Sequence, residues 1–361
     1  MQLSQSDSAR LEVSVIVPAR NEEASLGACL ESLTGQQGIA FEVIVVDDGS
    51  TDRTATIARS FRSVKLIQAG PLPKGWSGKS NAVYTGALQA RGEWLLFTDA
   101  DTVHLPGSLA RALDEAKSHG AAMLSYSPAQ ELHGFVQRAV MPVIFAELAA
   151  TYRPCEVSDP NSPTAAANGQ YLLITSEAYD AVDGHAAIAT CLLEDVELAR
   201  AVKLSGRRVR FRFGGDAVRT RMYRSFPQLV EGWTKNLALL FNTPARLATT
   251  RLLEFLAMVV GVAFAGLNRG DASRAMLVAI AVVLIYLKFL RRVLRAHADV
   301  LSSTLAVFGL PIFSYLLLRS KLYYKWRRSV TWKGRLYSTR VRNQQNERRT
   351  RACPAGERWS T

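Results

Sequence analysis

The sequence is poor in cysteine and histidine, the residues on which disulfide scaffolds and zinc centres depend. Its 361 residues include four cysteines and five histidines. No two of the cysteines are close in sequence; they are Cys29, Cys155, Cys191 and Cys353. This spacing argues against a disulfide framework, a zinc ribbon and a CxxC redox site, and it is typical of a reducing compartment.

An apolar run is also missing at the N-terminus. Residues 1–10 are polar, so we expect no secretory signal peptide. We therefore expect the N-terminal part of the chain to stay in the cytoplasm after synthesis. The whole sequence is 48% hydrophobic and 21% charged. This composition excludes global disorder and supplies enough apolar residues for a sizeable core.

The net charge of +13 is concentrated at one end of the chain. Residues 319–361 contain 13 of the 44 Lys and Arg residues but only 2 of the 31 acidic residues. A basic tail that follows an apolar stretch is typical of an anchor on a membrane surface. Its interleaved aromatic residues fit an interfacial belt better than a nucleic-acid site. We therefore expect a membrane, and no nucleic acid, as a partner.

Residues 11–236 have the pattern of a soluble α/β domain. Short β-branched apolar runs alternate with helical stretches, which predicts a Rossmann-like, mostly parallel sheet covered on both faces. Ligands of such sheets bind outside the carboxyl ends of the strands. The expected strands are 13–17, 42–46, 64–68 and 94–98, and the expected helices are 23–33, 51–60 and 80–90.

Residues 252–318 are the most apolar part of the chain. We expect membrane segments at about 252–267, 275–290 and 300–318, preceded by an interfacial connector at 237–251. Three buried helices of a soluble domain are the alternative. Three such segments followed by a basic tail would be unusual in water.

The positions of Lys and Arg predict the orientation in the membrane. Arg246 and Arg251 precede the first segment, and basic residues between 288 and 295 follow the second. An excess of Lys and Arg marks the cytoplasmic side, so we expect a multi-pass protein of the inner (cytoplasmic) membrane with its catalytic domain in the cytoplasm. We expect Pro311 to break the last segment into a re-entrant or in-plane hairpin, which keeps the tail 319–361 cytoplasmic.

Acidic residues follow several of the expected strands. Each group has a simple structural alternative, either a turn, a helix cap or solvated charges at a helix start. Together, at the carboxyl ends of neighbouring strands, they predict a site for a cation or for ribose hydroxyls. The groups are Pro18–Glu23, Asp47–Asp52, Asp99–Asp101 and Glu194–Asp195.

The chemistry of this set is consistent with transfer from a nucleoside diphosphate. An Asp-x-Asp motif can hold Mg²⁺ or Mn²⁺ against a diphosphate, here through Asp101. Lys79 would help to neutralise the leaving group. Carboxylates after the second strand can hydrogen-bond a base or ribose, and Asp195 can accept a proton from an acceptor hydroxyl.

The combined motifs resemble the family 2 glycosyltransferases of the GT-A fold over residues 11–236. The resemblance implies an inverting hexosyltransferase-type enzyme (EC 2.4 class) that needs a divalent metal and uses a nucleotide-sugar, with UDP favoured over GDP. Carried over residue by residue, the donor-binding residues are Pro18, Arg20, Glu22, Asp47, Asp48, Lys79 and Asp99. Asp101 would bind the metal, Asp195 would be the base, and Glu194 would belong to the catalytic set.

Further motifs resemble the membrane-anchored branch that includes hopanoid-associated and carotenoid glycosyltransferases. They are 73–79, 184–187, 222–225, 232–236 and 332–335. This resemblance implies transfer of one sugar to a hydroxyl or carboxyl of a lipid acceptor. The segment Gln228–Trp233 departs from the Gln-x-x-Arg-Trp motif of processive polysaccharide synthases. Such a synthase, and a non-catalytic membrane-bound sugar-nucleotide sensor, are the alternatives.

Four weaker candidates complete the expected site. Gly169, His185, Arg221 and Trp233 are candidates for contact with the acceptor or with phosphate. A turn, a structural histidine and a contact with lipid headgroups are the simpler interpretations of the first three. Gly78-Lys79-Ser80 ends like a Walker A loop, but Pro73 stands where that motif needs its first glycine.

Overall fold

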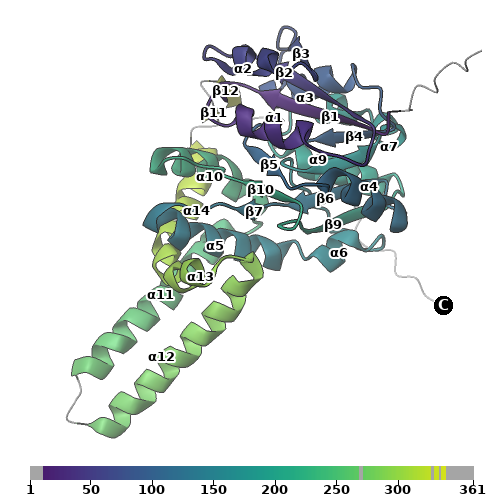
Figure 1. The fold of residues 1–361 in the computed structure, drawn as a ribbon. Helices are drawn as coiled ribbons and strands as arrows, with labels where there is room; N and C mark the ends of the chain where they lie inside the picture. The colour runs from purple at the N-terminus through teal and green to yellow at the C-terminus, as the bar shows by residue number, and fades with distance from the viewer. Residues whose placement is uncertain (1–10, 268–270, 327–328, 333–334, 339–361) are drawn as a thin grey trace, which may run out of the picture.

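The protein consists of an α/β sheet domain and a helical part that extends away from it (Figure 1). The computed structural model describes residues 11–267, 271–326, 329–332 and 335–338. Residues 11–133 and 152–225 form most of the sheet domain. The helical part comes from one helix in the middle of the chain and from the segment after residue 225.

A seven-stranded sheet forms the centre of the first part, in the order β3-β2-β1-β4-β8-β6-β9. β8 is antiparallel to both of its neighbours, and the other strands run in one direction. The expectation of a mostly parallel sheet is therefore confirmed. The strands are β1 (Val13–Ala19), β2 (Phe41–Asp47), β3 (Val64–Gln68), β4 (Trp94–Phe97), β6 (Met123–Ser127), β8 (Leu172–Thr175) and β9 (Val209–Phe213).

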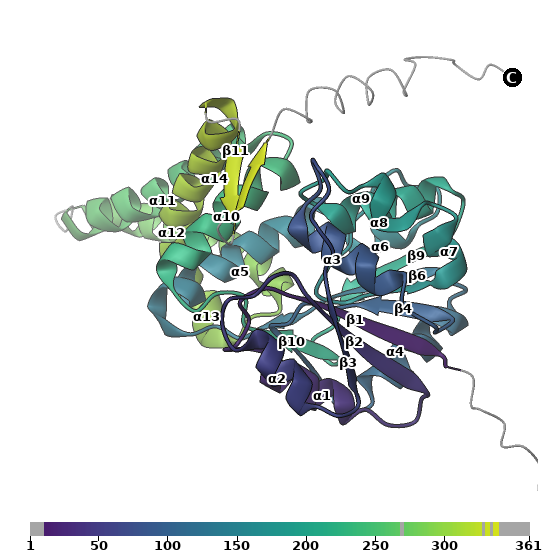
Figure 2. The ribbon, with the colours of Figure 1, turned by 90° about the horizontal axis from the view of Figure 1, so that it is seen from above.

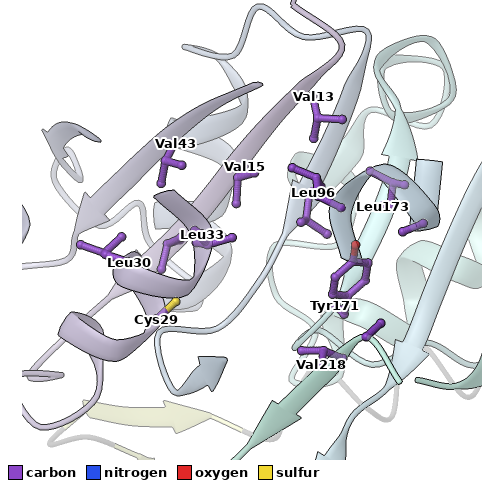
Figure 3. Packing of buried hydrophobic residues seen from close by; sticks show 14 of the residues in the cluster. Val13, Val15, Cys29, Leu30, Leu33, Val43, Leu96, Tyr171, Leu173 and Val218 are labelled. Carbon is purple, nitrogen blue, oxygen red and sulfur yellow. The ribbon is translucent and has the colours of Figure 1, made fainter. Parts of the chain in front are cut away.

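Both faces of this sheet are buried, which explains why its strands are almost continuously apolar. Val13 and Val15 pack with α1 and α4 on one face (Figure 3), while Ile16 packs with α3 and α9 on the other. The helices of this part are α1 (Leu26–Thr34), α2 (Thr54–Ser60), α3 (Gly78–Ala87), α4 (Ser108–Ser118), α6 (Pro154–Ser158), α7 (Ser176–Asp180), α8 (Gly184–Ala187) and α9 (Glu194–Leu204).

Helices α1 and α2 begin three residues later than expected because the loops before them bind each other. The Asn21 amide donates to Oγ of Ser50 (3.0 Å), and the Thr51 amide donates to Oδ1 of Asn21 (2.9 Å). Asn21 has a φ of 53°, a left-handed conformation that Asn tolerates better than most residues. These bonds fix the two loops at the carboxyl ends of β1 and β2.

A small second sheet holds the loop after β4 in place. It contains β5 (Thr102–His104), β10 (Val218–Thr220) and β7 (Ala129–Gln130), in that order. The Thr220 hydroxyl donates to the carbonyl oxygen of Asp101 (3.2 Å). The segment after β10 therefore starts beside the Asp-x-Asp turn.

The helical part has a hydrophobic core of its own, built from α5, α10, α11, α12 and α14. Figure 1 shows α11 and α12 as a hairpin that points away from the sheet, and Figure 2 shows β11 beside α10 and α14. The elements are α5 (Gly134–Thr151), α10 (Phe226–Leu240), α11 (Pro244–Leu267), α12 (Ala272–Val293), η1 (Leu294–Ala296), α13 (Val300–Leu305), η2 (Ala306–Phe308), α14 (Gly309–Trp326), β11 (Ser329–Trp332) and β12 (Arg335–Ser338).

Two helical stretches among the described residues are long and apolar enough to cross a membrane. They are Pro244–Leu267 and Val300–Trp326. The first is almost entirely exposed, while half of the second is buried against other helices. The expected segment 275–290 lies within α12, which also exposes large apolar side chains such as Leu277 and Leu284.

The boundaries of these segments differ from the sequence-based ones. The expected connector 237–251 is divided between the end of α10 and the start of α11. The last segment is interrupted by the 3₁₀ turn Ala306–Phe308 rather than at Pro311, which lies in the first turn of α14. Proline is tolerated there because the first turn of a helix needs no donor. Part of the expected tail, from residue 319 to Trp326, continues α14; residues 339–361 lie outside the described residues.

A buried network of four charged residues joins α5 to the base of the hairpin. Glu147 accepts bonds from Arg251 of α11 (2.8 Å) and from Arg292 of α12 (3.0 Å). Glu254 pairs with the same two arginines, at 3.3 and 2.7 Å. The network is neutral as a whole, and it fixes the direction in which the hairpin leaves the sheet domain.

Candidate active site

A cavity of about 640 Å³ opens at the carboxyl ends of the strands and extends to α5 and α10. Twelve of the fourteen candidate residues line it; Asp47 and His185 do not. The twelve are Pro18, Arg20, Glu22, Asp48, Lys79, Asp99, Asp101, Gly169, Glu194, Asp195, Arg221 and Trp233. The fold thus brings together residues from positions 18 to 233.

The two aspartates after β2 have different environments. Asp47 turns away from the cavity and accepts the Ser50 amide (3.1 Å), the turn interaction that was its structural alternative. Asp48 is buried and lines the cavity. The guanidinium of Arg20 donates to the carbonyl oxygen of Asp48 (2.6 Å), so this loop is held from the β1 side. Of the pair, Asp48 is the residue placed to meet a ligand.

Lys79 forms the charged centre of the cavity floor. Its Nζ lies 2.8 Å from Oδ1 of Asp99 and 3.0 Å from Oε1 of Glu194. Burial opposes its charged form, but Asp99, Glu194 and Asp195 raise the pKa of Lys79 well above its ordinary value. Burial also opposes the charge on Glu194, yet Lys79 holds the pKa of that carboxyl below its usual range. Lys79 therefore pairs with two carboxylates in the floor, and its expected contact with the leaving group stays a prediction.

Asp195 is oriented by two backbone amides. Its Oδ2 accepts the Gly169 amide (2.9 Å), and its Oδ1 accepts the Val196 amide (2.8 Å). Burial and the adjacent Glu194 raise the pKa of Asp195 to about 6, although Lys79 and the two amides act in the opposite direction. A carboxylate with this pKa is mostly ionised at neutral pH and is basic enough to accept a proton.

A side chain at Gly169 would displace the end of Lys79. A Cβ at this position would lie 2.9 Å from Nζ of Lys79 and 3.7 Å from Cβ of Asp195. The close approach lets the backbone of this turn reach the carboxylate. From the sequence we expected the backbone of Gly169 to approach a sugar or acceptor. In the structure this backbone approaches the Asp195 carboxylate.

Asp101 fits a metal site of the kind that a nucleotide completes. Asp101 lines the cavity. Asp99, two residues earlier in the sequence, forms an ion pair with Lys79. The described residues contain no group of three or more His, Cys, Asp or Glu side chains that could hold an ion by themselves. Mg²⁺ is commonly held by one or two carboxylates together with substrate phosphates. Asp101 provides such a carboxylate.

His185 is a structural residue in this arrangement. It is buried, its Nδ1 lies 3.0 Å from the Tyr179 hydroxyl, and its ring contacts the edge of Phe97 at 5.0 Å. Burial lowers the pKa of His185 to about 4, so the ring is neutral at pH 7. It borders a small space beneath Lys79 and Asp99.

Trp233 belongs to the opposite wall. Its indole Nε1 donates to Sδ of Met141 (3.3 Å), and its ring packs edge-on against Phe145 at 6.0 Å. Arg221 lines the cavity between this wall and the Asp-x-Asp turn. The two residues come from the segment that follows β10, as the sequence motifs suggested.

Comparisons with known proteins agree with this geometry. Residues 14–153 match the family described as "Glycosyl transferase family 2". The chain carries a family 2 glycosyltransferase domain. It is 29% identical over 346 residues to the 4,4'-diaponeurosporenoate glycosyltransferase of Staphylococcus aureus strain USA300, covering 90% of this chain and 88% of that protein. The protein of the same description from strain MRSA252 is 29% identical over 343 residues, with the same coverage of each chain.

A solved structure supports the fold. The mannosyltransferase PcManGT from Pyrobaculum calidifontis, in complex with GDP-Man and Mn²⁺, superposes with a TM-score of 0.53 at 16% sequence identity. The match covers 89% of each chain. The GT-A fold expected from the sequence is confirmed, and glycosyltransferase activity is confirmed as the enzyme class.

Several cavity residues of the glycosyltransferase were not found from the sequence. Phe145 and Leu148 come from α5, whose apolar sequence gives no sign of a site, and Leu240 ends α10. Lys235 lies in the segment 232–236, which resembled a family motif but suggested no role for it. Burial lowers the pKa of Lys235 below its ordinary value, and the nearby carboxylates of Glu194 and Asp195 oppose this shift only in part. This lysine therefore adds positive charge beside the carboxylates.

Proposed function

We propose that this glycosyltransferase moves one sugar, with inversion, from a nucleotide-sugar to a hydroxyl or carboxyl of a lipid acceptor at the cytoplasmic membrane face. The observation that carries the proposal is the position of Asp195. It lines the same cavity as the polar strand ends and the apolar side chains of α5 and α10. An acceptor and a donor can meet at this carboxylate.

The donor occupies the polar side of the cavity. Asp48, Asp99 and Glu22 offer oxygens to the base and ribose, while Arg20 and Pro18 shape the loop that borders them. The resemblance to family 2 enzymes favours a UDP-sugar over a GDP-sugar. Asp101 and the diphosphate together would hold Mg²⁺ or Mn²⁺, which when bound neutralises charge on the leaving group. Arg221 adds a positive charge at the same end.

Asp195 acts as the general base for a hydroxyl acceptor. Its two amide contacts fix the carboxylate, and its raised pKa suits proton acceptance near neutral pH. As the acceptor oxygen bonds to the anomeric carbon, its proton passes to Asp195. The bond from that carbon to the diphosphate breaks, and the diphosphate leaves with the electron pair. Attack from the face opposite the leaving group inverts the anomeric centre.

The helical part supports the proposal of membrane attachment. Helix α11 and the stretch Val300–Trp326 have the length and composition of spanning helices, and the α11–α12 hairpin points away from the sheet (Figure 1). Arg246 and Arg251 lie toward the start of α11, and Arg291 and Arg292 lie toward the end of α12. Both basic groups are at the base of the hairpin, which favours a cytoplasmic sheet domain in the inner membrane.

Nucleotide release from the detergent-purified protein tests the proposal. UDP- and GDP-sugars would be compared with Mn²⁺ or Mg²⁺, with and without a membrane lipid extract, beside Asp195→Asn. We expect release from one donor that requires the extract and is lost in the variant. Equal release by the variant would remove Asp195 as the base. A product extended by many sugars would instead support the processive alternative.

A further inference from the structure

The cavity has a polar part and a more apolar part, and the apolar part lies close to the candidate membrane helices α11 and α14. Its polar end is formed by the loops after the strands. Its other end is formed by apolar side chains to which the proposed function gives no role in binding the donor or in positioning Asp195. They are Phe145, Leu148, Trp233 and Leu240, with Ala167, Leu192 and Leu193 nearby.

Two helices hold this apolar end together. The ring of Phe145 on α5 packs edge-on against Trp233 on α10, with centroids 6.0 Å apart. At the far end of the same pair, the Tyr152 hydroxyl donates to the carbonyl oxygen of Leu240 (2.6 Å). Leu148 lies between these two contacts in the sequence of α5 and remains half-buried. The seam between α5 and α10 is therefore a built wall with defined ends.

Both sides of the seam lie close to the candidate membrane helices. Glu147, the neighbour of Leu148, binds Arg251 of α11 at 2.8 Å. Leu240 precedes Phe241, whose buried ring packs against Phe313 of α14. Helix α11 then begins at Pro244. The apolar end of the cavity is thus within a few residues of the two helical stretches that are suited to the bilayer.

We infer that the seam of α5 and α10, marked by Leu148 and Leu240, holds the hydrocarbon chain of the acceptor and admits it from the bilayer side. The inference rests on the proposed function, because it places the apolar part of that lipid acceptor. An apolar chain that enters here moves from the hydrocarbon of the bilayer to an apolar wall. It is not exposed to water on the way, so the transfer has little free-energy cost. Its polar end then lies at Asp195, opposite the donor.

The charges of the cavity favour this direction of binding. Asp48, Asp99 and Asp101 gather at the strand ends. A hydrocarbon chain at that end would cover carboxylates and leave them without solvent, which is unfavourable. At the seam, the same chain covers leucine and aromatic surface. The leucine and aromatic surface therefore suits the apolar chain better than the strand ends do, although Lys235 and Asn236 of α10 also line the cavity.

Two kinds of substitution at the seam test the inference. Leu148→Trp and Leu240→Trp would fill the space for the chain, and Leu148→Gln would keep the volume but make the wall polar. Leu239→Trp is the matched control, since Leu239 is a half-buried neighbour on α10 that does not line the cavity. The assay is nucleotide release driven by the membrane lipid extract, together with the donor dissociation constant of each variant.

We expect the three seam variants to need about tenfold more extract for half-maximal release, since each removes apolar contact with the chain. Their donor affinity should equal that of the unaltered protein, which also shows that they are folded. Leu239→Trp should behave like the unaltered protein.

Two results would overturn the inference. Seam variants that retain donor binding and respond normally to the extract would show that the chain lies elsewhere. An equal defect in Leu239→Trp would show that the effect is not specific to the seam. A different result would contradict the proposed function itself. If the unaltered protein released nucleotide from one donor and the extract did not stimulate this release, the proposal of a lipid acceptor would be wrong. The two failures are therefore distinguishable.

Discussion

The backbone amide of Gly169 donates a 2.9 Å hydrogen bond to Oδ2 of Asp195, across 26 residues of sequence. A Cβ on Gly169 would lie 2.9 Å from Nζ of Lys79, so the end of the lysine side chain would have to shift. The glycine therefore lets its amide bind the Asp195 carboxylate while Lys79 stays close to both.

Gly169→Ala should reduce turnover by about 10²-fold while the protein stays folded. The added methyl group displaces Lys79 or the amide that orients Asp195, and small misplacements of catalytic groups have effects of this size. Steady-state nucleotide release measures the change. Gly70→Ala is the matched control, because a Cβ at Gly70 meets nothing within 4 Å. Similar losses in the two variants would contradict this role for Gly169.

Asp195→Asn should keep donor binding and reduce turnover by about 10²–10⁴-fold, the usual contribution of a general base. The amide side chain is nearly the same size but cannot accept the proton. Calorimetric titration with the donor, beside release kinetics, separates binding from chemistry. A variant that loses both would indicate that Asp195 holds the donor instead.

The pH dependence of kcat/KM should show one rising limb near pH 6. Asp195 is protonated below its pKa of about 6 and cannot act as a base, so activity rises as the pH increases through that value. Glu194→Gln removes a charge that raises the pKa of Asp195, and this loss should move the limb to lower pH. Glu231→Gln, at an exposed cavity residue, is the control and should leave the limb in place. A limb unaffected by Glu194→Gln would mean that another group titrates.

Asp101→Asn should weaken the binding of the metal that turnover of the donor requires. With one carboxylate oxygen ligand replaced by an amide, about tenfold or more Mn²⁺ should be needed for half-maximal release. Titration of Mn²⁺ at a fixed donor concentration gives this value. Asp114→Asn, an exposed residue of α4, serves as the control. Identical titrations for the two variants would place the metal away from Asp101.

Arg292→Met should destabilise the protein by about 3 kcal/mol, because it leaves the two largely buried carboxylates of Glu147 and Glu254 to share the single positive charge of Arg251. Arg292 contacts both Glu147 and Glu254, at 3.0 and 2.7 Å. Thermal unfolding in detergent should show a lower midpoint for this variant than for Arg291→Met, whose side chain is exposed. Equal midpoints would show that the network contributes little to holding the hairpin.

The strands and the acidic site residues could be predicted because their signals are local. Runs such as Val13–Val17 are apolar on both faces only in a covered parallel sheet, and carboxylates directly after such strands meet at one edge. Helix starts were less accurate. The beginnings of α1 and α2 depend on bonds between two loops, such as that from Asn21 to Ser50, which no single segment reveals.

The amino-acid sequence by itself determined the family, the fold and twelve of the residues that line the cavity, since these follow from the order of side chains along each strand and its loop. The tertiary structure decided which of Asp47 and Asp48 lines the cavity, because that depends on how one turn is bonded. It also decided that Lys79 binds Asp99 and Glu194, and that α5 supplies an apolar wall. These relationships join residues that are far apart in the chain, so they exist only once the chain has folded.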